Sequence, residues 1–351
     1  MDRESREMLL ETAGRLFADR SGKEVVNAVE KGEWPAGLWS EITDMGLPLV
    51  AVPEAAGGAD GTLADLLALL RLSGSHAVPV PLMETALANL VLAAAGGVPV
   101  EGPAALIAGG LTLAGGKVSG TAKRVAFAGV AAQFVAVIGV GPAARVVVLD
   151  RSSAKVAVEP SFAGEPYGSA QFEGAAPVQN LASPVSEVRL RELAALARAM
   201  QMAGAADRAL AITVEYCKQR SQFGRPISNF QAIQHLLAEL ASCVAATVAA
   251  AEAASRDASE VGIGSGAEFS IAAAKTQASE FAQRIAAMAH QSMGAMGFTQ
   301  EHVLHHYTRR LWVWRRDWGS ETEWGAELGA AVARAGAETL WPTLTSSRFA
   351  A

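Results

Sequence analysis

Five residues around a predicted helix end, between positions 220 and 231, carry groups that could bind a nucleotide. Arg220 offers a planar, always charged guanidinium group that suits a pyrophosphate. Phe223 can lie against an adenine or ribose face, and Gly224 lets the chain turn sharply after the helix. Gln231 supplies an amide for hydrogen bonds to a base or ribose, and Gln222 completes this candidate set. The same residue types also fit an ordinary helix C-terminus, where an arginine meets the helix dipole and a glycine caps the helix.

A second candidate phosphate site follows a long helical stretch, at Gln291-Ser-Met-Gly294-Ala-Met-Gly297. Glycines at these two positions would let the backbone approach a phosphate closely. A simple turn between two helices would explain the same glycines. Gln291, Gly294 and Gly297 are therefore candidates for cofactor binding.

Bulk composition narrows the class of protein. The chain has 351 residues, of which 51% are apolar and 18% are charged, so disorder is excluded and two or three packed units are expected. The net charge of −6, with no basic tract, argues against nucleic acid and anionic membrane surfaces as partners. Cys217 and Cys243 match neither a metal spacing nor a disulfide framework, which indicates a reducing cytosol. We expect a cytoplasmic protein without a metal site.

The elements that must position these residues fall into three segments. Residues 1–97 show helical spacing of apolar residues, residues 98–184 are rich in valine and glycine, and residues 185–351 return to long helical stripes. Short strands are expected at 117–119, 124–127, 134–138, 145–149, 155–158 and 169–173. The order predicts an α+β protein with an N-terminal helical domain, a small middle β-barrel and a C-terminal four-helix bundle.

One uncharged stretch, residues 125–144, is long enough to span a bilayer. It contains three glycines and a proline, is rich in valine and is broken into short pieces. These features predict two buried strands with a turn rather than a transmembrane helix.

The chain resembles the acyl-CoA dehydrogenase family over most of its length. The strongest match is Tyr216-Cys-Lys-Gln-Arg-Ser-Gln-Phe-Gly-Arg-Pro-Ile-Ser-Asn-Phe-Gln231, which is similar to the family's helix–turn–helix with an arginine, an aromatic–glycine pair and a downstream glutamine. Further matches are Pro53-Glu54 with Gly57-Gly58, residues 74–81, residues 291–298 and residues 309–324.

The resemblance implies a flavoprotein of lipid metabolism that converts an acyl-CoA to a 2,3-enoyl-CoA with FAD and passes electrons to an electron-transfer flavoprotein. It implies a dimer of dimers, in which Arg220, Phe223 and Gln231 bind the ADP part of an FAD held mostly by a neighbouring subunit. The loop with Gly294 and Gly297 would contact the flavin pyrophosphate across the same interface.

The catalytic base is the first departure from the family pattern. Relatives carry a glutamate-glycine-threonine stretch whose glutamate removes the α-proton. Here Gly319-Ser320 matches the glycine and threonine, so Trp318 occupies the glutamate position. Asp317, next to that position, is one candidate base. Glu192 is the other, because some relatives place the glutamate near the start of the first long C-terminal helix. Both acids could instead be ordinary helix charges or salt-bridge partners. Ser320 and Thr322 are candidate hydrogen-bond donors to a flavin.

The middle β segment is the second departure. Relatives line the flavin ring with a threonine-glutamate-proline stretch and a glycine-serine-aspartate stretch, and nothing in residues 96–120 matches either one.

Some relatives are mixed α2β2 tetramers with FAD at only part of the interfaces. An alternative function is therefore a non-catalytic subunit that completes the FAD site of a partner chain. Two further alternatives are a relative with monooxygenase or nitroalkane-oxidising chemistry, and a helical scaffold that binds no nucleotide.

Overall fold

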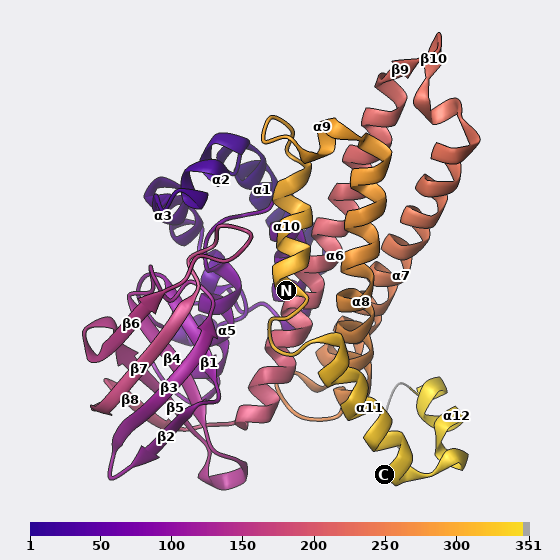
Figure 1. Cartoon of the computed structure of the whole chain (residues 1–351). Helices are drawn as coiled ribbons and strands as arrows, with labels where there is room; N and C mark the ends of the chain where they lie inside the picture. Colours follow the sequence, from indigo (N-terminus) through magenta and orange to yellow (C-terminus); the bar gives the residue numbers. More distant parts are fainter. Residues whose placement is uncertain (347–351) are drawn as a thin grey trace. The chain divides into compact units, whose positions relative to one another are not determined.

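The protein is described by a computed structural model that covers residues 1–346 (Figure 1). The chain forms two compact units. The first contains Met1–Leu70, Pro79–Ala194 and Ala258–Ser265, and the second contains Arg71–Val78, Ala195–Asp257 and the chain from Gly266 onward. The predicted division into three domains, at 97/98 and 184/185, stays a prediction.

Helices dominate the first 97 residues, as the sequence predicts. They are α1 (Arg3–Arg20), α2 (Lys23–Glu30), α3 (Ala36–Asp44), α4 (Leu63–Ser75) and α5 (Leu82–Ala94). Local caps explain where some of them begin. Asp2 accepts a hydrogen bond from the Ser5 N–H at 2.8 Å at the start of α1. Asp65, in the first turn of α4, accepts one from the Thr62 N–H at 2.7 Å.

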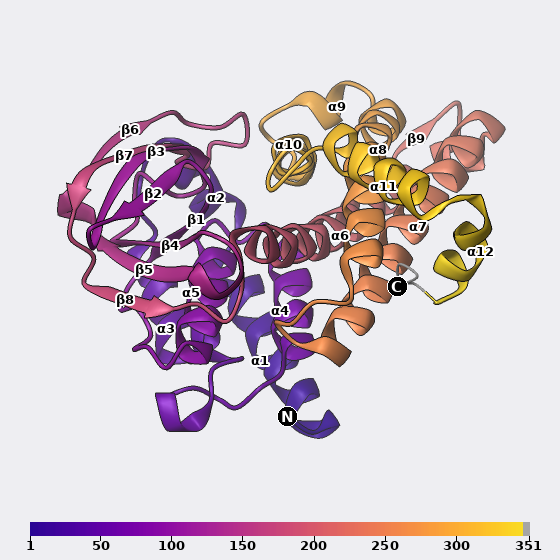
Figure 2. The same ribbon diagram turned by 90° about the horizontal axis from the view of Figure 1, so that it is seen from below.

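Two four-stranded sheets form the middle segment and lie as two layers (Figure 2). Their orders are β1-β4-β5-β8 and β2-β3-β7-β6. The strands are β1 (Ala104–Ala108), β2 (Leu111–Ala114), β3 (Lys117–Val125), β4 (Gln133–Ile138), β5 (Arg145–Asp150), β6 (Ala154–Val158), β7 (Gly168–Ala175) and β8 (Gln179–Ala182). β1 pairs with β4 in parallel, and the other neighbours are antiparallel. Phe134 from one sheet meets Phe172 from the other edge to face, 5.6 Å apart, in a shared apolar core.

Several strand predictions need correction. The predicted strands at 117–119 and 124–127 are one strand, β3, whose pairing with β7 shifts register twice. Residues 126–132 then form a turn, so residues 125–144 hold one complete buried strand, β4, rather than two. Strands β1, β2 and β8 are absent from the predicted set, because alanine and asparagine have low strand propensity and hid the alternating pattern.

The C-terminal part is built from helices. They are α6 (Glu187–Gln219), α7 (Gln231–Val261), α8 (Glu268–Met293), α9 (Ala295–Phe298), α10 (Leu304–Trp314), α11 (Glu321–Ala335) and α12 (Ala337–Ser346). Of these, α6, α7 and α8 are the longest. In the second unit, α6, α7, α8 and α10 run side by side as a bundle (Figure 1). The Arg284–Glu239 ion pair at 2.6 Å links α8 to α7. Cys217 and Cys243 are both free, buried thiols.

Two glycines allow one very close helix contact in the second unit. A Cβ on Gly204 of α6 would lie 1.9 Å from the Arg71 carbonyl oxygen, and a Cβ on Gly74 of α4 would lie 2.1 Å from the Gln201 carbonyl oxygen. Only glycine permits backbones to approach this closely.

Within residues 1–346, α7 is long and apolar enough to cross a membrane by length and composition alone, and 28% of its most apolar stretch is buried.

Candidate functional site

The predicted adenine-binding residues lie on a hairpin after α6. Strands β9 (Ser221–Gln222) and β10 (Arg225–Pro226) pair antiparallel around Phe223 and Gly224. Both turn residues have positive φ, 52° for Phe223 and 79° for Gly224. A left-handed phenylalanine is strained and here turns its ring into solvent, with 92% of Phe223 exposed.

The remaining residues of this group are also on the surface. Arg220, Gln222 and Gln231 are exposed. Phe230 supports the hairpin, since its ring meets that of Phe223 edge to face at 6.1 Å and lies 4.2 Å from the Arg225 guanidinium carbon. The structure thus places Gln222, Phe223 and Gly224 on the hairpin, with Arg220 directly before it and Gln231 at the start of α7. An aromatic face and a cation are exposed there to a ligand.

The predicted glycine loop lies between α8 and α9. Gly294 ends α8 with φ 61° and ψ −145°, a conformation that L-residues rarely adopt. Gly297 is buried, and a Cβ there would meet Met293 at 3.1 Å and the His290 ring at 3.2 Å. The close approach that requires glycine at 297 is therefore to this chain's own helix, while Gly294 and Gln291 face solvent.

His290 holds this loop from the end of α8. Its ring stacks on Phe298 with centroids 4.6 Å apart, and Nε2 lies 2.9 Å from the Thr308 hydroxyl of α10. Burial lowers the pKa of His290, so the ring is neutral at physiological pH.

The turn between α10 and α11 carries Asp317, one of the two predicted bases. Asp317 is 6% exposed, and its carboxylate lies 3.3 Å from Arg198 Nε of α6. Trp318 follows with φ 59° and Gly319 with φ 107°. Asp317 is thus held in a buried ion pair. Its carboxylate could contact a ligand only if it left or shared its contact with Arg198.

Ser320, predicted to bind a flavin, is the N-cap of α11. Its hydroxyl accepts a hydrogen bond from the Glu323 N–H and donates one to the Glu323 carboxylate, which also accepts from the Ser320 N–H. Thr322 is exposed on the first turn of the same helix. The capping box explains Ser320 without a ligand, and its role toward a flavin stays a prediction.

Glu192, the other predicted base, lies in the first unit near the start of α6. Its carboxylate lies 3.0 Å from Arg189 Nη1. Arg189 Nε also donates to the carbonyl oxygen of Ile263, just beyond the end of α7, at 3.2 Å. Glu192 therefore orients Arg189, and Arg189 donates a hydrogen bond to a carbonyl group just beyond the C-terminal end of α7.

A buried polar cluster in the second unit was not foreseen from the sequence. Arg198 donates to Gln201 at 2.6 Å, and Gln201 donates to Ser73 of α4 at 3.2 Å. Lys275 of α8 is completely buried and donates to Ser279 and to the carbonyl oxygens that end α10. The signal in the sequence was a lone charge inside an apolar helical stripe, at Lys275 between Ile271 and Ala278.

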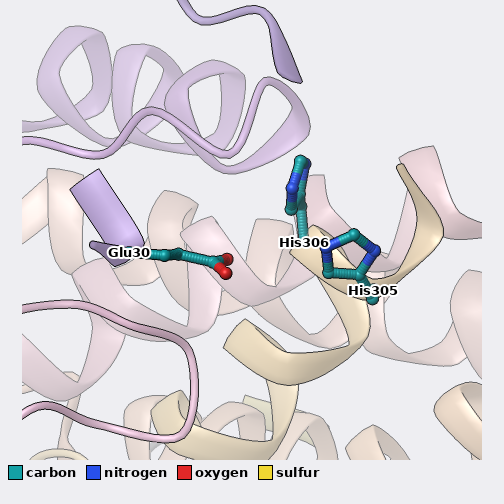
Figure 3. Close-up of side chains that lie close together, drawn as sticks. All are labelled: Glu30, His305 and His306. Carbon is teal, nitrogen blue, oxygen red and sulfur yellow. The ribbon is translucent and has the colours of Figure 1, made fainter. Parts of the chain in front are cut away.

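Two adjacent imidazoles open α10. His305 and His306 lie 4.2 Å apart, ring to ring (Figure 3), and His305 Nδ1 lies 2.7 Å from the His302 carbonyl oxygen. Glu30, the third side chain drawn there, ends α2 in the other unit.

One cavity of about 290 Å³ lies in the first unit, between the 29–34 turn and the strands. Its walls are mainly apolar and include Val29, Trp34, Pro79, Phe127, Val130, Val158 and Pro166. That volume is below the range of sites for drug-sized ligands, so this cavity alone cannot hold a dinucleotide or an acyl-CoA.

Comparisons with known proteins agree with these features. Residues 3–97 match the N-terminal domain of acyl-CoA dehydrogenase, and residues 192–316 match its C-terminal domain. The acyl-CoA dehydrogenase IpdE2 of Mycobacterium tuberculosis is 32% identical over 318 residues, which cover 88% of this chain and 91% of the relative.

Solved structures share the fold. The ChsE4–ChsE5 complex of Mycobacterium tuberculosis superposes with a TM-score of 0.84 at 22% identity, covering 96% of this chain and 99% of the other. The Tcur3481–Tcur3483 steroid ACAD variant gives a TM-score of 0.81 at 26% identity, covering 94% and 98%. Together, the domain matches and the long alignment with IpdE2 show that the chain belongs to the acyl-CoA dehydrogenase family.

Proposed function

We propose that the chain works as an FAD-dependent acyl-CoA dehydrogenase that forms a 2,3-enoyl-CoA thioester. The observation that carries this proposal is the hairpin at 220–231. Its turn presents Phe223, held at positive φ and 92% exposed, while Arg220 directly before the hairpin and Gln231 at the start of α7 are also exposed. Strain of this kind is typical of functional sites. An aromatic face and a guanidinium fit an adenine and a pyrophosphate.

The residues of this chain suit the ADP part of an FAD but not its isoalloxazine ring. β1 and β2 are joined by Gly109 and Gly110 alone. A Cβ on Gly110 would lie 2.5 Å from the Thr121 carbonyl oxygen, so even one side chain is excluded there. This tight turn leaves no loop to line a flavin ring, which supports an assembly in which another subunit supplies those contacts.

A mixed assembly of two related chains is therefore part of the proposal. The ChsE4–ChsE5 and Tcur3481–Tcur3483 structures are both named as pairs of chains. By analogy, we propose a hetero-oligomer that contains this chain and a second acyl-CoA dehydrogenase. An electron-transfer flavoprotein as electron acceptor and a cytoplasmic location stay predictions.

When bound, FAD would accept a hydride from the β-carbon of the substrate. The chain's own part in the reaction would be to hold the ADP end through Arg220 and Phe223 and to supply a carboxylate for the α-proton, with Asp317 as the first candidate. Asp317 would have to leave or share its contact with Arg198 to accept that proton.

The second candidate function is a non-catalytic subunit that completes the FAD site of the partner. The observation in its favour is that both candidate bases, Asp317 and Glu192, are held by arginines, while Trp318 occupies the position of the family's glutamate. In that case, the partner chain would supply the base.

The experiment that tests both functions compares the chain purified alone with the complex purified from its native host through a tag on this chain. Reduction of an artificial electron acceptor is measured with short, long and steroid-derived acyl-CoA substrates. The last class is included because the Tcur3481–Tcur3483 complex is named a steroid enzyme. The proposal predicts turnover by the complex, which Asp317→Asn abolishes. Turnover that survives this substitution favours the non-catalytic role, and a complex without activity on any acyl-CoA rejects the dehydrogenase function.

A further inference from the structure

Lys275 is a completely buried lysine whose ammonium group has three hydrogen-bond acceptors. Its Nζ lies 2.8 Å from Ser279 Oγ, 2.9 Å from the Arg315 carbonyl oxygen and 3.3 Å from the Trp314 carbonyl oxygen. An ammonium group has three N–H donors, so donors and acceptors match in number. Such a match is needed because a buried charge without partners would be costly.

The two carbonyl groups belong to the end of α10, where helical carbonyls lack partners within the helix. Ser279 adds a second contact, because its hydroxyl donates to the Arg315 carbonyl oxygen at 2.9 Å. Lys275 and Ser279 of α8 therefore act as a side-chain cap for α10. The Trp314 carbonyl oxygen also accepts the Asp317 N–H at 3.1 Å, so the cap continues into the next turn.

The turn at 315–320 is thus held from two helices of the second unit. From α8, Lys275 and Ser279 hold its first carbonyl groups. From α6, Arg198 meets the Asp317 carboxylate, and its guanidinium carbon lies 5.1 Å from the centre of the Trp314 ring. A displacement of either anchor would move Asp317.

We propose that Lys275, together with Ser279, is a positioning residue for the 315–320 turn, which carries the candidate base Asp317 and the helix cap Ser320. The reaction role of this turn rests on the proposed dehydrogenase function, whereas the anchoring rests on the contacts alone. Since neither residue has a place in the ligand-binding hairpin, their effect on the reaction would be indirect.

Protonation of Lys275 controls the number of contacts it can make. Burial lowers the pKa of Lys275 to about 7. The negative charges of Asp317, Glu321 and Glu323 raise this pKa, and the positive charge of Arg198 lowers it further. The neutral amine has only two N–H donors for its three acceptors. The longest contact, to the Trp314 carbonyl oxygen, is the one expected to be lost. Opening of the turn that exposes Lys275 to water would let it bind a proton again, so this opening should become less favourable as the pH rises above 7.

Hydrogen exchange followed by mass spectrometry on the full chain tests the anchor. The amides to follow are those of Arg315, Arg316 and Asp317, each hydrogen-bonded to a carbonyl of α10. Ser279→Ala is expected to speed their exchange roughly fivefold, because one hydrogen bond to the turn is lost. Ser270→Ala is the matched control: Ser270 is also buried on α8, but its hydroxyl donates to the Ala267 carbonyl oxygen at 3.1 Å, away from the turn.

A pH comparison separates positioning from a purely structural role. After correction for intrinsic exchange, protection of the turn in the wild-type chain is expected to rise between pH 7 and pH 8.5, because opening then takes up a proton at Lys275. In Lys275→Met, which has no titrating group at this site, protection should be low and independent of pH. In the assembled enzyme, Ser279→Ala should lower kcat roughly tenfold at unchanged KM, because a displaced base reacts slowly while binding is intact.

Three outcomes decide the matter. If the amides of the turn exchange at the same rate in wild type, Ser279→Ala and Lys275→Met, then Lys275 and Ser279 do not anchor the turn. Faster exchange with unchanged kcat overturns the role in positioning for the reaction. Faster exchange in an assembly that has no wild-type activity leaves the anchor established and rejects the proposed function alone.

Discussion

Replacement of Lys275 by methionine should change how the stability of the protein depends on pH. Methionine keeps much of the buried side-chain volume but removes the charge and the hydrogen-bond donors. The folded chain holds Lys275 at a pKa of about 7, because burial opposes its charge, against 10.5 for an ordinary lysine. Between these two pH values the unfolded chain binds one more proton at this residue than the folded chain does.

The sign of the effect follows from this difference in bound protons. Stability rises with pH wherever the unfolded state binds more protons, here by up to about 1.4 kcal/mol per pH unit. At pH 7, half of the folded molecules still carry the proton, so the slope reaches its full value only above that pH. From pH 7 to pH 9, wild type should therefore gain about 2 kcal/mol relative to Lys275→Met.

Urea unfolding at pH 7, 8 and 9, followed by circular dichroism, measures this difference. Titrations shared by the two proteins cancel in the comparison. Lys218→Met, which removes an exposed lysine from α6, shows whether loss of one positive charge changes the pH dependence by itself. A wild-type advantage that stays constant or shrinks as the pH rises would mean that Lys275 keeps its proton in the folded state, contrary to this prediction.

Three further predictions concern the second unit. Gly204→Ala should lower the free energy of unfolding by about 1–3 kcal/mol, since its Cβ would lie 1.9 Å from a carbonyl oxygen; Gly325→Ala, in open space on α11, should leave it unchanged or raise it by up to about 1 kcal/mol. Asp317→Asn should cost about 3 kcal/mol in urea unfolding, because it breaks a buried pair with Arg198; an unchanged midpoint would show that the pair contributes little. Ser320→Ala should cost about 1 kcal/mol through loss of the α11 cap, and a thermal midpoint equal to that of wild type would contradict this role.

Local sequence signals were enough to predict the helices and the sharp turn at Phe223 and Gly224. The arginine, aromatic and glycine at 220–224 lie within a few residues of one another, so their order along the chain already places them on one turn. Helical stripes of apolar residues likewise predicted α6, α7 and α8. The family resemblance is confirmed by the domain matches at both ends of the chain.

Long-range contacts account for what the sequence could not predict. Arg198 and Asp317 are far apart in the chain, as are Lys275 and the carbonyl groups that end α10, and backbone acceptors leave no trace in the residue types. Asp317 was proposed as a base because of its position beside Trp318, but its pairing with Arg198 depends on how two helices pack. β1 and β2 were missed because small residues carry a weak strand signal.

We propose that the segment 220–231, with its hairpin around Phe223, holds the ADP end of an FAD. Its most direct test is the FAD content per chain of the purified native complex, measured by flavin absorbance for wild type, Arg220→Ala and Arg256→Ala. Arg256 is an exposed arginine on α7, away from the hairpin in sequence. Bound FAD is expected in wild type and Arg256→Ala, and a loss of most of it in Arg220→Ala. Equal FAD content in all three, or no FAD in the wild-type complex, would contradict it.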